Sequence, residues 1–371
     1  MNIAIVGCGF VADYYAVTLA AYPRLTVRGV ADRNPLRAKA FSTHHHLPMY
    51  VTLEDLLADE TVEIVVNLTD PRSHFEVSKA CLEAGKHVYS EKPLAMDIPD
   101  GSALVELARE LGLSLSCAPC SLLGETAQTI WRALRRDEVG TVRLVYAEMD
   151  EGMVFRMPYR RWVSASGAAW PFRDEFEVGT VLEHAGYVVT WLPAFFGPAT
   201  EVTGFAASLV PEKVPGENFL APDFASACIR FTSGVVARVT CSLVASHDHS
   251  LRIFGDRGVL RTDDTWLYSS VVKVRRSVNV GPKAVQLPWR RRRLMGTKRR
   301  YRYRGVQQMD FARGVDDLAE AIDRGCSPRL SAEYSLHVTE LVLALQRSLG
   351  QGGSYEMTTT CQTPEPMPWA R

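Results

Sequence analysis

The sequence predicts an α/β protein that begins with a Rossmann domain, a doubly wound parallel sheet, over residues 1–120. Short β-branched runs alternate with helix-like stretches there, which is typical of a parallel sheet covered by helices on both faces. A glycine-rich turn directly follows the first run and opens the first helix. After residue 120 successive strands and turns favour a largely antiparallel sheet, so we expect a C-terminal α+β domain over residues 121–371 for substrate binding and oligomerisation.

The elements of both domains can be placed in order. The expected strands of the first domain are NIAIVG, TVRGVAD, VEIVVNL, KHVYS and LSLSCAP, and its helices cover about 11–21, 35–43, 53–58, 72–84 and 97–111. The second domain should begin with a helix near 124–136 and the strand TVRLVYAEM, followed by an aromatic and arginine-rich loop and a helix over 178–192. Strands follow from about 200, and helices at about 308–324 and 331–349 precede a polar tail.

Composition limits the class of protein. The 371 residues include 42 basic and 42 acidic ones, which argues against a general nucleic-acid or membrane-surface binder. The first residues, MNIAIVGCGF, do not resemble a signal peptide, and no apolar run is long enough to span a bilayer. Eight scattered cysteines are typical of reduced thiols, so we expect a cytoplasmic protein. The pair Cys117 and Cys120 is interpreted as packing at a strand end.

The first chemical motif is G-x-G-x-x-A, formed by Gly7, Gly9 and Ala12. A dinucleotide pyrophosphate needs a tight turn, a close backbone approach and free amides at a helix N-terminus, and these three small residues supply them. Asp32 ends the second strand, where a carboxylate accepts hydrogen bonds from the ribose hydroxyls and repels a 2′-phosphate. NAD is therefore favoured, and Arg33 beside it leaves NADP possible.

The second motif is Glu91-Lys92-Pro93, which follows the fourth expected strand. Ligands bind outside the carboxyl ends of such strands, so Lys92 can point into the cleft. A surface ion pair that opens a loop is the structural alternative.

These segments, with SHFEVSKACLEAGKHVYSEKPLA and GTVLEHAGY, resemble the Gfo/Idh/MocA family of NAD(P)-dependent oxidoreductases over nearly the whole chain. The resemblance implies that Lys92 lies beside the nicotinamide and hydrogen-bonds the oxygen that is oxidised or reduced. It also implies a sugar, cyclitol or related polyol substrate and a homodimer or homotetramer. His74 should brace the cofactor loop. The expected cofactor-binding residues are Gly7, Gly9, Phe10, Val11, Ala12, Asp32, Arg33, Thr69, His74, Glu91, Lys92 and Pro93.

The helix expected over 178–192 carries the remaining catalytic candidates. The resemblance aligns Glu183 and Tyr187 with the family's acid–base pair, although the paired glycines of the family reduce here to Gly179. Lys92, Tyr187 and Glu183 are thus the expected catalytic residues: Tyr187 exchanges the proton, with its pKa lowered by Lys92, and Glu183 orients groups. A buried structural tyrosine is one alternative. His184 is another acid–base candidate, about 100° round the helix from Glu183.

Other polar clusters are interpreted more simply. The histidines at 44–46 and 247–249 are assigned to surface loops, and no metal site is expected, because adjacent residues rarely bind one ion without further ligands. The basic stretch 290–304 is interpreted as a solvated insertion or an oligomer contact rather than a nucleic-acid site, and a clamp for a phosphorylated or nucleotide-linked substrate is a further alternative. Four side chains before the catalytic helix could line the substrate pocket: Arg160, Arg161, Trp170 and Arg173.

The sequence therefore predicts an oxidoreductase that transfers a hydride between NAD(P) and a secondary alcohol or ketone. Two alternatives stay open. The chain could bind the cofactor as a sensor or partner protein without net turnover. It could also keep NAD permanently bound and use transient oxidation for elimination or glycosidic cleavage.

Overall fold

The computed structural model of the protein describes residues 1–294, 308–351 and 353–371. Its first domain is built on a five-stranded sheet in which every pair of neighbours is parallel, in the order β2-β1-β3-β4-β5. This confirms the predicted Rossmann-like sheet. The strands are β1 (Asn2–Val6), β2 (Thr26–Ala31), β3 (Ile64–Asn67), β4 (His87–Ser90) and β5 (Leu115–Cys117).

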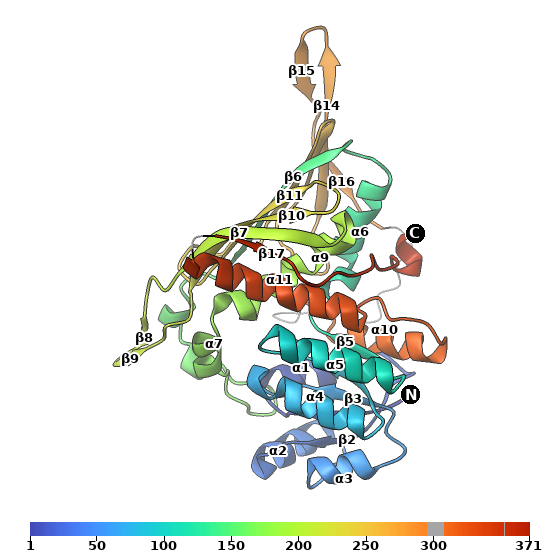
Figure 1. The fold of residues 1–371 in the computed structure, drawn as a ribbon. Coiled ribbons are helices and arrows are strands. Elements are labelled where there is room, and N and C mark those ends of the chain that lie inside the picture. Colours follow the sequence, from blue (N-terminus) through green and yellow to red (C-terminus); the bar gives the residue numbers. More distant parts are fainter. Residues whose placement is uncertain (295–307, 352) are drawn as a thin grey trace.

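Helices cover both faces of this sheet, as Figure 1 shows. Alternate residues of β1 belong to two separate cores: Ile3 and Ile5 pack on one face, and Ala4 and Val6 pack on the other. Burial on both faces explains why these strands are continuously apolar. The covering helices are α1 (Phe10–Leu19), α2 (Pro35–His45), α3 (Leu53–Ala58), α4 (His74–Glu83) and α5 (Ile98–Glu110).

The second domain contains a ten-stranded sheet in the order β15-β14-β13-β12-β6-β11-β10-β7-β17, with β16 paired to β14. All of these pairs are antiparallel except β6 with β11, which agrees with the largely antiparallel sheet predicted. A separate small hairpin joins β8 (Glu212–Val214) to β9 (Glu217–Asn218). The strands of the large sheet are β6 (Val142–Asp150), β7 (Ala199–Ala207), β10 (Phe224–Phe231), β11 (Val236–Ser242), β12 (Leu251–Gly255), β13 (Gly258–Thr262), β14 (Val272–Val280), β15 (Lys283–Gln286), β16 (Arg290–Arg292) and β17 (Ser354–Glu356).

The helices of the second domain pack with this sheet around the largest hydrophobic core. The helix expected over 178–192 is divided differently in the structure. It begins earlier, with α7, breaks at Gly179, and resumes as a π-helical turn over Val181–Ala185. The helices are α6 (Glu125–Arg135), α7 (Phe172–Val178), α8 (Gly186–Val189), α9 (Trp191–Phe196) and α11 (Ala332–Gln351).

One C-terminal helix, α10 (Ala312–Asp323), packs against the Rossmann domain. Its residues Ala312 and Val315 share a core with Ile3 and Tyr15. A Cβ atom at Gly314 would lie 2.2 Å from the hydroxyl of Tyr89 in β4, so only glycine permits this close approach. The chain thus returns to its first domain after residue 310, whereas the boundary near residue 120 stays a prediction.

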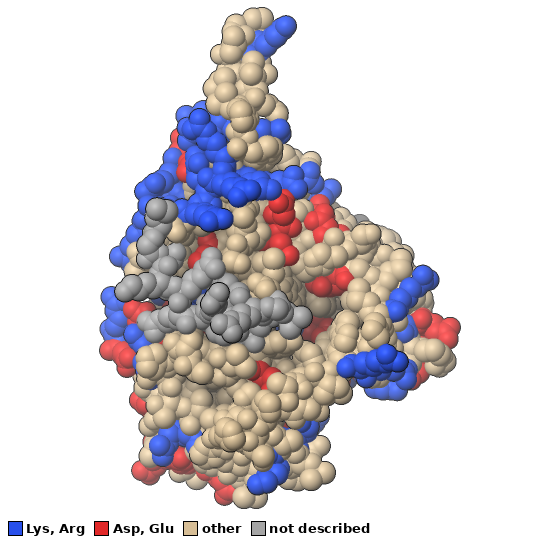
Figure 2. Space-filling model, turned by 180° about the vertical axis from the view of Figure 1, so that it is seen from behind, with Lys and Arg blue, Asp and Glu red and all other residues tan. Residues whose placement is uncertain are grey.

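The hairpin of β14 and β15 was not predicted from the sequence, and it projects beyond the rest of the molecule in Figure 1. The basic stretch 290–304 begins with β16, so its first three arginines belong to the sheet, and residues 295–304 lie outside the described ones. In Figure 2, Lys and Arg side chains gather below the projecting tip, and acidic side chains surround a hollow further down.

Candidate active site

A cavity of about 1150 Å³ is lined by residues of both domains. Ten of the twelve expected cofactor-binding residues line it. The two exceptions are Ala12, which is buried in the packing under α1, and Pro93, which is buried behind Lys92. The three expected catalytic residues line the same cavity. The structure therefore brings together side chains that are up to 180 positions apart in the chain (Gly7 to Tyr187).

The glycine-rich turn has the backbone that a pyrophosphate requires. Gly7 has φ +94°, and a Cβ there would lie 2.5 Å from the carbonyl oxygen of Leu68, so a larger residue cannot replace it. Gly9 stands at the N-cap of α1, and a Cβ built on it meets no atom within 4 Å. The free amides at this helix N-terminus thus face open space, which fits a bound dinucleotide phosphate.

Asp32 lies at the end of β2 beside this turn. One carboxylate oxygen accepts a hydrogen bond from the backbone N–H of Cys8 at 2.7 Å, and the other accepts one from the N–H of Asn34 at 2.7 Å. The carboxylate is therefore fixed in orientation while it still lines the cavity. The side chain of Arg33 is 85% exposed and lies 3.5 Å from Asp70, so it can move toward a ligand.

His74 braces two segments of the cavity wall. Its ring nitrogens lie 2.7 Å from the carbonyl oxygen of Pro93 and 3.1 Å from that of Thr69. Burial lowers the pKa of His74, so the ring is neutral and only one nitrogen can donate a proton at a time. The hydroxyl of Thr69 donates to Asn67 at 2.7 Å. This arrangement fits the bracing role that the sequence predicted.

Glu91 and Lys92 point in different directions after β4. Glu91 is buried and accepts hydrogen bonds from the hydroxyl of Tyr15 at 2.7 Å and from the N–H of Lys92 at 3.1 Å. The ammonium of Lys92 forms an ion pair with the carboxylate of Glu183 and lies 6.0 Å from the centre of the Tyr187 ring. The surface ion pair considered from sequence is therefore absent: Glu91 supports the backbone and Lys92 faces the cavity.

The local backbone explains why one helix presents so many polar groups to the cavity. Gly179 has φ +95°, and a Cβ there would lie 2.9 Å from the Cβ of Ala221, so glycine is required where α7 ends. The π-helical turn that follows is wider than an α turn, and such turns are common at functional sites. Glu183, His184 and Tyr187 all line the cavity as a result. Glu183 and His184 line one cavity but contact different groups, since Glu183 pairs with Lys92 and His184 lies between Glu151 and Glu175.

The pKa values correct a second expectation. Burial raises the pKa of the Tyr187 phenol well above its ordinary value, and the nearby Lys92 ammonium offsets this only in part. The lowered pKa expected from sequence is therefore not found. Burial by itself would lower the pKa of Lys92, but Glu183 and Tyr187 outweigh it and the net shift is upward. Lys92 is thus a permanent ammonium and Tyr187 a neutral phenol near pH 7.

His184 is engaged by two carboxylates. Its ring nitrogens lie 3.1 Å from Glu151 and 3.5 Å from Glu175. Burial opposes the charged form, but these carboxylates dominate and raise the pKa of His184 to about 10. His184 is therefore protonated at neutral pH and cannot accept a substrate proton in that form.

Several cavity residues were not anticipated from the sequence. The indole of Trp266 lies 4.2 Å from the ring of Tyr187, centre to centre, and Glu151 and Glu175 flank His184. No local motif identifies them, because they come from separate segments. Of the four side chains proposed for the substrate pocket only Trp170 lines the cavity, whereas Arg173 forms an exposed ion pair with Glu217.

Comparison with known proteins agrees with this geometry. Residues 1–118 match the model described as "Oxidoreductase family, NAD-binding Rossmann fold" of Gfo/Idh/MocA proteins, and residues 127–261 match the "GFO/IDH/MocA C-terminal domain". The chain belongs to the Gfo/Idh/MocA family. It is therefore an NAD(P)-dependent dehydrogenase or reductase, and the predicted family, enzyme class and cofactor are confirmed.

Members of the family and similar structures are distant in sequence. The trans-1,2-dihydrobenzene-1,2-diol dehydrogenase of Sus scrofa is 24% identical over 276 residues, which cover 72% of this chain and 76% of that protein. The NAD-binding oxidoreductase of Klebsiella pneumoniae has a TM-score of 0.79 at 19% identity, covering 96% of this chain and 98% of the other. The aldose–aldose oxidoreductase of Caulobacter crescentus has a TM-score of 0.74 at 17% identity, covering 96% and 99%.

In the described part of the chain, no helix combines the length and the apolar character that crossing a membrane requires.

Proposed function

We propose that the protein transfers a hydride between NAD(P) and a secondary alcohol or ketone of a sugar, cyclitol or related polyol. The observation that carries this proposal is the meeting of Lys92, Glu183 and Tyr187 in the cavity that also contains the glycine-rich turn. NAD is the preferred cofactor in this proposal, because the fixed carboxylate of Asp32 repels a 2′-phosphate.

Each residue of the group has a distinct task. The nicotinamide ring, when bound, gives or takes the hydride. The ammonium of Lys92 donates a hydrogen bond to the reacting oxygen and stabilises the charge that develops on it, and Glu183 holds that ammonium in place. The phenolate form of Tyr187 accepts the hydroxyl proton during oxidation, and the neutral phenol returns a proton during reduction. Trp266 packs against the ring of Tyr187 and limits its movement.

The rest of the cavity is suited to a polyol. Carboxylates accept hydrogen bonds from hydroxyl groups, and Asp174, Glu151 and Glu175 line the cavity for this purpose. Trp162 and Trp170 add flat apolar surfaces that can pack against the C–H face of a sugar or cyclitol ring. The combination supports a substrate that is rich in hydroxyl groups and has an apolar face.

A second candidate substrate is a cyclic vicinal diol with an apolar ring. The apolar part of the lining favours it, since Phe176 and Leu243 join the tryptophans on the cavity wall. The similar proteins of Sus scrofa and Mus musculus are named trans-1,2-dihydrobenzene-1,2-diol dehydrogenases, which supports including this class.

One assay tests the proposal. The purified protein is incubated with NAD or NADP and a panel of aldoses, inositols, acyclic polyols and cyclic diols, and the absorbance of NAD(P)H is followed. We expect net NAD(P)H to form with at least one polyol and to form faster with NAD. Tight cofactor binding with no net reduction across the panel would instead favour the sensor. Cofactor retained through purification, together with substrate elimination or cleavage, would favour the permanently bound form.

A further inference from the structure

Two groups of histidine and carboxylate side chains in the described residues could hold a metal ion, and none of their histidines has a role in the proposed reaction. In each group the ligand atoms lie within 4.8 Å of one another, which is close enough to consider a shared metal ion. One group contains Asp13, His44 and His45, and the other contains Glu151, His247 and His249. The partners of each group decide between them.

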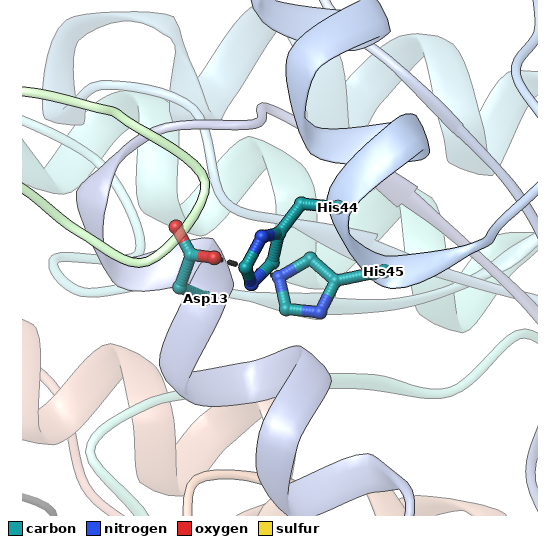
Figure 3. Close-up of side chains that lie close together, drawn as sticks. All are labelled: Asp13, His44 and His45. Atoms are coloured by element: carbon teal, nitrogen blue, oxygen red, sulfur yellow. Dashed lines mark hydrogen bonds and ion pairs between the residues drawn. The ribbon is translucent and has the colours of Figure 1, made fainter.

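The group at Asp13 already has a complete set of hydrogen bonds. Figure 3 shows His44 and His45 of α2 facing Asp13 of α1. One oxygen of Asp13 lies 2.6 Å from the Nε2 atom of His45 and accepts from the N–H of Ser166 at 3.1 Å, and the other accepts from the Ser166 hydroxyl at 2.7 Å. This carboxylate is buried and joins the two domains. A metal ion would have to displace those donors.

The carboxylate of Glu151 also has a neighbour, the Nδ1 atom of His184 at 3.1 Å, but that nitrogen makes no hydrogen bond with the described residues. Glu151 Oε1 lies 3.0 Å from the Nε2 atom of His249, and His247 is exposed, so its side chain can rotate toward the same point. The rings of His247 and His249 are already 4.2 Å apart, centre to centre. They stand two residues apart, and Asp248 and His249 form isolated β-bridges, so this spacing suits side chains on the same side of the chain. The spacing of the two histidines can be seen in the sequence. The sequence could not show that Glu151, which follows β6, lies beside them.

The surroundings of His249 match those of a metal ligand. A ligating histidine usually turns its second ring nitrogen toward a carboxylate, which fixes the ring and its tautomer. The Nδ1 atom of His249 lies 3.8 Å from the carboxylate of Asp264. It is buried and makes no hydrogen bond with the described residues, so a small rotation of the ring would complete this contact. The side chain of His249 is 3% exposed, and such a buried ring is held in place.

We propose that Glu151, His247 and His249 form a binding site for a divalent transition-metal ion, with zinc as the ion whose ligand preference fits best. Two imidazole nitrogens and one carboxylate oxygen are a ligand set found in zinc sites, and three protein ligands leave a further position open. Zinc holds such atoms at about 2.0–2.2 Å, so the three side chains would move closer together around the ion. Glu151 also lines the active-site cavity, so the ion would lie at its wall.

Zinc binding to the purified full chain tests the site without reference to turnover. Chelator-treated protein is dialysed against Zn²⁺, and bound metal is measured by mass spectrometry together with the shift in melting temperature. We expect one zinc per chain and an upward shift. His247→Ala removes an exposed side chain and should preserve the fold, and we expect it to weaken zinc affinity at least tenfold. Glu151→Gln and His249→Ala should weaken it at least as much.

The matched control is His44→Ala, which removes an exposed histidine from the other group and should leave zinc affinity unchanged. Co²⁺ provides a second readout, because visible absorption bands of a four-coordinate site should appear in the native protein and be lost in His247→Ala. The proposal is overturned if the native protein binds no zinc, or if binding survives in His247→Ala, as it would for adventitious binding at the exposed Cys228 or Cys326. Loss of binding in His44→Ala would also overturn it.

Discussion

Lys92 and Glu183 form an ion pair across the cavity although they are 91 residues apart in the chain. Lys92 follows a strand of the Rossmann sheet, and Glu183 belongs to the π-helical turn of the second domain. Their side chains are only 16% and 7% exposed. The pair thus ties the two domains together at the point where we propose that the reacting oxygen binds.

The first prediction separates the catalytic role of Lys92 from its role in the fold. Lys92→Met should lower kcat at least about a hundredfold, because the charge on the reacting oxygen loses its stabilising ammonium. It should also destabilise the fold by roughly 3–5 kcal/mol, since Glu183 is left buried without a partner. The double variant Lys92→Met, Glu183→Gln should regain much of this stability and none of the activity. Recovery of turnover in the double variant would show that Lys92 acts only through the fold.

The second prediction concerns Tyr187 and the pH dependence of oxidation. Burial holds the pKa of Tyr187 above its ordinary value of 10, so only a small fraction is ionised near neutral pH and that fraction grows as pH rises. The log of kcat/KM for oxidation should therefore rise with pH through 10 without an earlier plateau. Tyr187→Phe should reduce oxidation by about 10²–10⁴-fold and abolish this rise.

His184→Ala is the control for Tyr187, and it should keep the rise with pH. The opposite result, in which the Phe variant keeps the rise and the His184 variant loses it, would assign the acid–base role to the histidine.

The third prediction concerns the choice of cofactor. Asp32→Asn removes the charge and keeps an oxygen that can accept from the N–H of Cys8. It should raise the affinity for NADP relative to NAD, because the repulsion of the 2′-phosphate is lost. Asp32→Ser should do the same. If only the serine variant changes the ratio of the Kd values for NADP and NAD, then Asp32 shapes the turn and its charge does not select the cofactor.

The residues on the cofactor side of the cavity could be predicted from the sequence, because local motifs place them at the ends of strands. The glycine-rich turn, Asp32 and Lys92 each follow a strand of a parallel sheet, and the carboxyl ends of such strands meet at one edge. The substrate side was less predictable. Glu151 and Trp266 reach the cavity through the pairing of distant strands and through loops, and neither belongs to a recognisable motif. The π-helical turn at Val181–Ala185 was not foreseen because α-helical spacing was assumed.

The fourth prediction tests the contact between the domains at Ser166. Its hydroxyl donates to Asp13 at 2.7 Å and accepts from Arg37 at 2.9 Å, and Arg37 also donates to the Cys8 carbonyl in the glycine-rich turn. Ser166→Ala should lower stability by about 1–3 kcal/mol, because it leaves buried polar groups with fewer partners. It should also raise the KM for the cofactor. Ser102→Ala, on the exposed face of α5, should change neither by a measurable amount.

The proposed hydride transfer is tested most directly by a single-turnover measurement. Native protein and Lys92→Met, each saturated with NAD, are mixed with the most active polyol of the panel, and NADH formation is followed. The amount of NADH that the native protein forms in its first turnover should be proportional to the amount of enzyme. Lys92→Met should bind NAD with similar affinity and form NADH at least about a hundredfold more slowly. Equal rates in the two proteins, or no NADH from the native protein with any polyol, would contradict the account.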